Sequence, residues 1–185
     1  MAKPRIMFDH DGRHPLIYMY EPPIRREELE AAVDELVGTP VEALMLTLGD
    51  IRSLLYDSQA GELWGRDVEK WPHLIWRRAN QNFRSLIAGG NDPLRVLCER
   101  AHAKGMQLYA TLLVQQGPRE RMLKSWEEED FSADDWRFRL HPLDIGSRGG
   151  VERDWPGYRC PDFANPEVRA RTLAVVAEVV ANYPV

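Results

Sequence analysis

The chain has 185 residues, of which 44% are hydrophobic and 29% are charged, and its formal net charge is −5. These values are typical of one globular domain and exclude a disordered or fibrous chain. Lysine and arginine are scattered along the sequence, so it lacks the clustered positive charge that a nucleic-acid partner requires.

The sequence shows no membrane or secretory segment. No apolar run reaches the roughly 18 residues that a membrane-spanning helix needs, so we expect no membrane partner. The first residues, MAKPRIMF, lack the apolar core and cleavage site of a secretory signal. The sequence therefore predicts a cytoplasmic protein, in which Cys98 and Cys160 are too few for a disulfide framework and stay reduced.

Strands and helices alternate in the first half of the chain. Residues 5–8 (RIMF) are a short apolar run followed by the polar stretch 9–12, which predicts a buried strand that ends in a polar loop. Residues 25–37 carry apolar side chains at helical spacing, and Gly38 is the residue type with which helices commonly end. Residues 41–48 (VEALMLTL) are almost continuously apolar, which is typical of a strand covered on both faces in a parallel sheet.

The same alternation continues after a long gap. Asp92 and Pro93 begin a helix that closes at Gly105, and residues 106–114 (MQLYATLLV) form the next predicted strand. A last helix begins after Asn165 and presents an apolar face made of Val168, Thr172, Val175, Val176, Val179 and Tyr183. Strands that alternate with helices predict a parallel α/β fold with right-handed crossovers.

Two long intervals, at about residues 49–77 and 115–164, interrupt this alternation. Each follows a predicted strand, so both belong to the edge of the sheet that the carboxyl ends of the strands form. Connections of this length inside a compact domain are usually functional, and this edge holds the ligand site in α/β folds. The intervals therefore predict where a ligand binds within a single domain of residues 1–185.

All six tryptophans lie in or at the edge of these two intervals: Trp64, Trp71 and Trp76 in the first, and Trp126, Trp136 and Trp155 in the second. An indole offers a large flat surface and an N–H donor, which suits stacking on the apolar face of a sugar ring. The alternative is that the tryptophans anchor the long loops by burial. We expect at least one of the six to stack on a ligand.

Polar side chains follow each predicted strand. The candidates for binding hydroxyl groups or transferring protons are Asp9, His10 and Asp11 after the first strand, Asp50 and Arg52 after the second, and Gln115 and Gln116 after the third. Asp11 with Gly12 is also a common turn pair, and Asp50 has the alternative of capping the next element. The remaining histidines show no metal-ligand spacing, so the sequence predicts no metal and no cofactor.

Residues 6–12 (IMFDHDG) resemble the first motif of haloacid dehalogenase-like phosphatases. In that family a strand is followed by Asp-x-Asp-Gly, in which the first carboxylate attacks phosphorus and the second serves as general acid and base. The resemblance implies those roles for Asp9 and Asp11. Arg13 departs from the Thr or Val that usually comes next.

Five longer segments together resemble the amino-terminal half of a bacterial glycoside-hydrolase-like TIM-barrel family: DHDGRHPLIYMYEPP, VDELVGTPVEALMLTLGD, LWGRDVEKWPHLIWRRANQNFRSLI, ERAHAKGMQLYATLLVQQ and DFANPEVRARTLAVVAEVVANY. The phrase D-F-x-N-P-E-V-R before a helix ending in Asn-Tyr is the most suggestive of these. The resemblance implies about three βα units of an incomplete (β/α)8 TIM barrel, with the acidic residues on a strand beyond Val185. We therefore expect an unstable, inactive fragment with exposed sheet edges.

The resemblance also implies an activity. It implies hydrolysis of a glycosidic bond by two carboxyl groups, which would lie outside this sequence, so the catalytic residues are unknown. The binding roles it implies are sugar-hydroxyl contacts by Asp9, His10 and Asp50, a cleft floor of Gln115 and Gln116, and stacking on Trp64 and Trp71, with Arg52 as a further strand-end candidate. A third hypothesis is a barrel that binds carbohydrate without cleaving it.

Overall fold

The computed structural model of the protein describes residues 3–51, 53–66, 68, 71, 74–114, 142–152 and 157–185. Three of the residues predicted for the ligand site lie outside these ranges, namely Arg52, Gln115 and Gln116. The tryptophans of the second interval, Trp126, Trp136 and Trp155, lie outside them as well.

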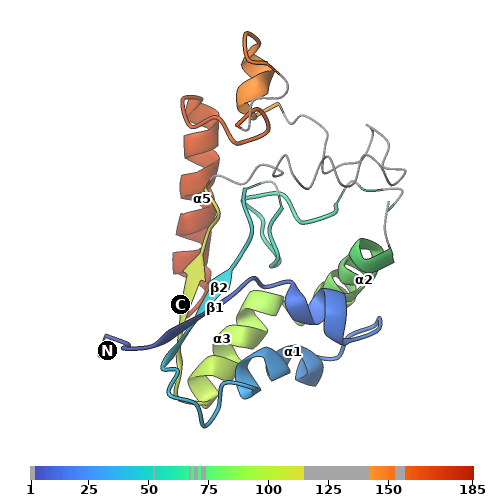
Figure 1. Ribbon diagram of the computed structural model, residues 1–185, viewed down its shortest axis with the longest axis vertical. Helices are drawn as coiled ribbons and strands as arrows, with labels where there is room; N and C mark the ends of the chain where they lie inside the picture. Colours follow the sequence, from blue (N-terminus) through green and yellow to red (C-terminus); the bar gives the residue numbers. More distant parts are fainter. Residues whose placement is uncertain are drawn as a thin grey trace.

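Three parallel strands form a single sheet in the order β1-β2-β3. They are β1 (Met7–His10), β2 (Ala43–Thr47) and β3 (Gln107–Thr111). Phe8 of β1 is opposite Leu44 of β2, which is in turn opposite Leu108 of β3. The predicted parallel α/β arrangement is therefore confirmed for these strands (Figure 1).

Two helices, α1 (Arg26–Asp34) and α3 (Pro93–Ala103), connect successive strands. They pack against each other, and Figure 1 shows them together on one side of the strands. Leu44, Leu46 and Leu108 belong to the core shared with these helices, and each is at most 3% exposed. Burial of one such side chain contributes about 1.5–3 kcal/mol, so this face holds the sheet and its helices together.

The opposite face of the sheet carries the alternate residues of each strand, which include Met7, Met45 and Tyr109. Met7 is 40% exposed and Tyr109 is 41% exposed. The Tyr109 hydroxyl donates to Gln107 Oε1 at 2.8 Å, a bond within its own strand. The described part of the chain therefore covers this face only partly.

The first strand differs from its prediction. It begins two residues later than predicted and continues through Asp9 and His10, whose backbones pair with β2 although we expected them in a loop. The strand lies at the edge of the sheet, and Met7, Phe8 and Asp9 are exposed. The prediction of a buried first strand is therefore wrong, because an edge strand has a neighbour on one side only.

The first long interval is shorter than predicted, because α2 (Leu74–Ala88) begins inside it. Buried Ala79, Phe83 and Leu86 lie at the spacing of one helical face, which is a sequence signal for a helix. Two short elements were also not predicted. They are η1 (Pro15–Met19), a turn of π-helix after β1, and η2 (Ile145–Arg148), a 3-10 helix inside the second interval.

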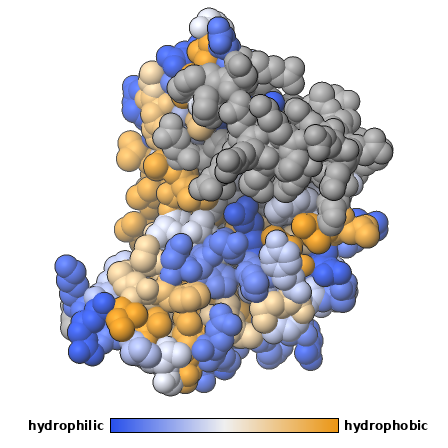
Figure 2. All heavy atoms as spheres, viewed as in Figure 1, coloured by the Kyte–Doolittle hydropathy of each residue, from blue (hydrophilic) through white to orange (hydrophobic). Residues whose placement is uncertain are grey.

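The last helix, α5 (Pro166–Asn182), begins as predicted, since Asn165 Oδ1 accepts from Glu167 N at 2.9 Å. Val168, Val175 and Val179 are buried, as expected. Val176 is 46% exposed, which contradicts its predicted place on the buried face. It belongs to the neighbouring apolar strip of Leu173, Val176 and Val180, and apolar surface over α5 is visible in Figure 2.

None of the helices in the described ranges combines the length and the apolar character that crossing a membrane demands.

Candidate functional site

The loops that follow the three strands meet in a small depression at the carboxyl ends of the strands. Its lining residues are Asp11, Arg13, Thr47, Gly49, Ser53, Leu55, Trp64 and Leu113. The cavity volume is about 10 Å³, which is about the space of one water molecule. The described residues thus bring the three strand ends together, as the sequence predicts, and they form a floor rather than a deep pocket.

Two glycines allow the loops to approach this closely. Gly12 has φ of +72°, and a Cβ added there would lie 2.5 Å from the Thr47 carbonyl oxygen. Gly49 has φ of +92°, and its added Cβ would lie 2.1 Å from the Ser53 carbonyl oxygen. Any side chain at either position would displace backbone, so both glycines are required by the shape of the strand ends.

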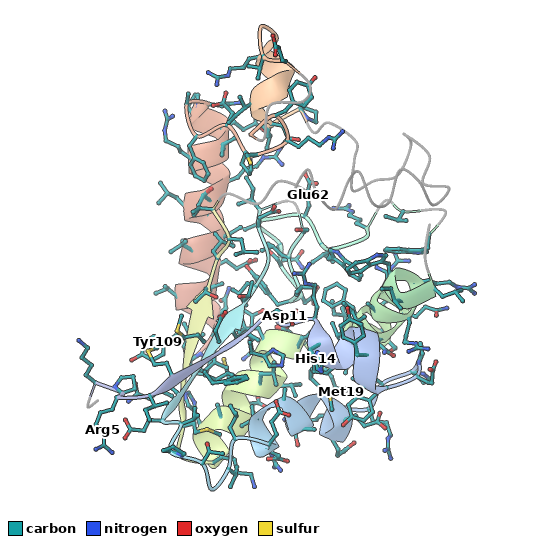
Figure 3. All side chains as sticks on the ribbon, viewed as in Figure 1. Arg5, Asp11, His14, Met19, Glu62 and Tyr109 are labelled. Atoms are coloured by element: carbon teal, nitrogen blue, oxygen red, sulfur yellow. The ribbon has the colours of Figure 1, made fainter. Side chains whose placement is uncertain are left out.

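Asp11 organises the turn that leads from β1 into η1. Its Oδ1 accepts hydrogen bonds from Arg13 N at 2.9 Å and from His14 N at 3.0 Å. Figure 3 shows Asp11 and His14 close together where the chain enters η1. The carboxylate therefore has a structural role in the turn while it also lines the depression.

His10 lies at the end of β1 and is 6% exposed. Its Nδ1 accepts from Gly12 N at 3.0 Å, which places the proton of the neutral ring on Nε2. Burial lowers the pKa of His10, against the opposing effect of the nearby Asp11 carboxylate. The imidazole shapes the turn and is not among the residues that line the depression, and neither is the exposed Asp9.

Asp50 begins the loop after β2 and is 3% exposed. Its Oδ1 accepts from Ser53 Oγ at 3.0 Å, and its carbonyl oxygen accepts from Ser53 N at 3.0 Å. Both bonds close a tight turn beside Gly49. Asp50 thus fixes the position of Ser53, which does line the depression.

The tryptophans of the first interval form an aromatic cluster. Trp64 is 4% exposed, and its ring centroid lies 5.6 Å from that of Trp71 and 6.1 Å from that of Trp76. Asn80 Nδ2 donates to the Trp64 carbonyl oxygen at 3.1 Å. The burial of Trp64 favours the anchoring role over sugar stacking, whereas Trp71 and Trp76 are half-buried.

Two exposed aromatic residues near the depression were missed from the sequence. His14 precedes η1 and Tyr18 lies within it, with ring centroids 5.3 Å apart, and Tyr18 is 60% exposed. Their spacing of four residues directly after the predicted strand-end motif was the available signal. The pair offers apolar ring surface and hydrogen-bonding groups beside Asp11 and Arg13.

Asn82 of α2 holds η1 in place. It is fully buried, and its Nδ2 donates to the carbonyl oxygens of Leu16 and Tyr20, both at 2.9 Å. Its Oδ1 accepts from Ile24 N at 3.0 Å. One amide side chain therefore fixes the connection from β1 to α1, including the aromatic pair at the strand ends.

Among the residues that the structure describes, no three His, Cys, Asp or Glu side chains are grouped so that they could hold a metal ion.

No protein-family model matches the chain, and no curated protein matches it. The function is therefore argued from the geometry of the strand ends and from the resemblances in the sequence.

Proposed function

We propose that the three-stranded sheet is part of a glycoside-hydrolase-like (β/α)8 barrel that binds carbohydrate at the carboxyl ends of its strands. The observation that carries the proposal is the sequential order β1-β2-β3 with α1 and α3 packed together on one face. Successive strands of a barrel follow this order, with all helices outside. The partly covered opposite face supports it, because that face lines the interior of a closed barrel.

The depression supplies suitable contacts for sugar hydroxyl groups. Arg13 brings a guanidinium donor, and Thr47 and Ser53 bring hydroxyls that both donate and accept. Thr47 Oγ1 lies 3.2 Å from Thr111 Oγ1, so β3 adds a further hydroxyl at the same edge. Exposed His14 and Tyr18 then provide the aromatic surface for the apolar face of a sugar ring.

Cleavage of the bound sugar requires two carboxyl groups on either side of the glycosidic bond. The family resemblance places these acids on another strand, so binding and orientation are the roles proposed for the residues described here. The phosphatase hypothesis gains no support from Asp11, because the turn into η1 accounts for its carboxylate. We therefore do not propose phosphoryl transfer.

Calorimetric titration of the protein with a panel of oligosaccharides tests the proposal. Tyr18→Ala and Arg13→Ala should each weaken binding by about fivefold or more, because each removes about 1 kcal/mol of contact energy. Met19→Ala is the matched control, since Met19 is an exposed residue of the same turn. Absence of binding across the panel, or equal affinity in all three variants, would contradict the proposal.

Turnover distinguishes the two forms of the proposal. Release of reducing sugar from a bound oligosaccharide by a form of the protein that includes these acids supports a hydrolase, and binding without release by that form supports a barrel that only holds carbohydrate.

A further inference from the structure

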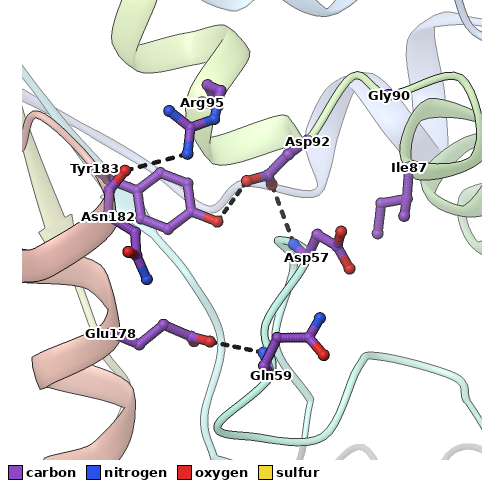
Figure 4. Close-up of a pocket in the computed structure, with 9 residues that line it drawn as sticks. All are labelled: Asp57, Gln59, Ile87, Gly90, Asp92, Arg95, Glu178, Asn182 and Tyr183. Carbon is purple, nitrogen blue, oxygen red and sulfur yellow. Dashed lines mark hydrogen bonds between the residues drawn. The ribbon is translucent and has the colours of Figure 1, made fainter.

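A second cavity lies away from the strand-end depression, between the loop after β2, the start of α3 and the end of α5. Its volume is about 380 Å³, which is within the range of small-molecule sites. Figure 4 shows its lining, in which Asp57, Gln59, Arg95 and Asn182 come from these three segments. None of these residues belongs to the depression described above.

Two carboxylates hold the walls of the cavity in position. Glu178 of α5 accepts hydrogen bonds from Tyr56 Oη at 2.7 Å, Ser58 Oγ at 2.6 Å and Gln59 N at 2.7 Å. It also accepts from Ala60 N at 3.2 Å. The Glu178 side chain therefore holds the loop after β2 against α5 by hydrogen bonds.

Asp92 connects the start of α3 to the other two segments of the cavity. It is the N-cap of α3, with Oδ1 accepting from Leu94 N at 3.3 Å and from Asp57 N at 3.1 Å. Its Oδ2 accepts from the Tyr183 hydroxyl at the end of α5. Arg95 donates to the Asn182 carbonyl oxygen at 3.1 Å and lies 5.0 Å above the Tyr183 ring. The cavity is thus formed before any ligand arrives, which lowers the cost of binding.

Other side chains at the cavity remain available for a ligand. Within the described part of the chain, the Asp57 carboxylate and the Gln59 and Asn182 carboxamides make no hydrogen bond, although their backbones do. The remaining N–H groups of Arg95 extend this set. The free groups therefore include both donors and acceptors in one small space.

The chemistry of this set selects a class of ligand. Carboxamides donate and accept, a carboxylate accepts and a guanidinium donates, which together match hydroxyl groups that do both. Anions are disfavoured because Asp57, Asp92 and Glu178 outnumber the single cation Arg95. Ile87 and Gly90 supply an apolar wall for ring carbons. We propose that this cavity is a second binding site, which takes a neutral polyhydroxylated molecule of monosaccharide size.

Titration of the ¹⁵N-labelled protein with glucose, galactose, mannose and inositol at millimolar concentration tests the proposal. At least one of these probes should shift the amide signals of Asp57, Gln59 and Asn182 in a saturable manner. The site does not depend on the proposed function, because shifts at Arg13, His14 and Ser53 report the strand-end depression separately.

Variants of the free side chains sharpen the test. Gln59→Ala and Asn182→Ala should each weaken binding of the responding probe by about fivefold, the effect of one lost hydrogen bond. Gln81→Ala, an exposed glutamine of α2, is the control and should leave affinity unchanged. No saturable shift at the cavity with any probe, or equal affinity in all variants, would overturn the inference even if sugars bind at the strand ends.

Discussion

Two helices, α2 and α5, are held to the rest of the protein in different ways. α2 is fastened to η1 by the neutral, fully buried amide of Asn82 and by apolar side chains such as Phe83 and Leu86. α5 has buried valines too, but its polar contacts converge on the Glu178 carboxylate and on Asp92. Docking of α5 therefore depends strongly on charge, whereas the charged contact of α2, the Arg78–Glu21 ion pair, involves a Glu21 side chain that is 75% exposed and contributes little.

The electrostatics of Glu178 follow from its surroundings. Burial raises the pKa of this carboxyl group, but the hydrogen bonds from Ser58, Tyr56 and the backbone of Gln59 and Ala60 outweigh it and hold the pKa below its usual range. Burial also raises the pKa of Tyr56, so its hydroxyl remains a neutral donor. The bonds that fasten α5 thus require Glu178 in its ionised form.

The largest expected effect is that of Asn82→Ala. The change leaves Ile24 N and two buried carbonyl oxygens without partners, so we expect the free energy of unfolding to fall by about 3 kcal/mol. Urea denaturation of the variant measures this loss. Asn91→Ala, at a half-buried asparagine whose side chain makes one long hydrogen bond to the Gly89 carbonyl oxygen, is the control. A loss at Asn82 no larger than at Asn91 would show that η1 does not rely on this amide.

Glu178→Gln should have the next largest effect, a loss of about 2 kcal/mol at neutral pH after allowance for partial exposure. Its carboxamide nitrogen would face donors rather than acceptors. Because the folded pKa is lowered, the stability from Glu178 is complete above the unfolded pKa of about 4.5 and is lost as pH falls below it. The variant should therefore show less acid destabilisation than the parent, which urea titrations at several pH values measure. If the free energy of unfolding changed with pH in the same way in the variant and the parent, the contact of Glu178 would not depend on its charge.

The comparison also predicts which of the two helices, α5 or α2, unfolds first in acid. As the pH falls below about 4.5, amides of α5 should lose hydrogen-exchange protection before amides of α2, since Glu178 accepts several hydrogen bonds in its ionised form whereas the carboxylate paired with α2, Glu21, is exposed. Mass spectrometry of exchanged peptides measures both helices in one sample. Simultaneous loss of protection would mean that the two helices open as one unit.

The smallest expected effect concerns His10. Its folded pKa lies below the unfolded value of 6.5, so the unfolded state binds more protons and stability falls as pH is lowered through and below that value. His10→Asn keeps an acceptor for Gly12 N and should flatten this part of the profile. His102→Asn, at an exposed histidine of α3, is the control. If the free energy of unfolding of His10→Asn kept the same dependence on pH as the parent, a group other than His10 would be responsible for it.

Much of the fold could be predicted because its signals are local. The Asn165 cap, the glycine after the α3 helix and the apolar run of β2 each report on neighbours a few residues away. The exposure of β1 could not be predicted, because burial of a strand depends on which strands flank it. The order of helices and strands therefore follows from the spacing of residues in the sequence, whereas the exposure of each strand does not.

The candidate site was predictable in place but not in detail. Polar residues after parallel strands share one edge, and the structure gathers Asp11, Thr47 and Ser53 there. That Trp64 is buried, and that Asn82 reaches Ile24 across 58 residues of sequence, depends on long-range packing. Sequence spacing carries no signal for such contacts, so it left burial and ligand stacking open for each tryptophan and gave no indication of the Asn82 contacts.

Hydrogen exchange in the presence of a saturating oligosaccharide tests the central claim, carbohydrate binding at the carboxyl ends of the strands, most directly. The account predicts added protection in residues 11–20, 49–51 and 53–55, which follow β1 and β2, and none in residues 38–42 and 104–106 at the amino ends of β2 and β3. Protection confined to the amino ends of the strands would contradict it.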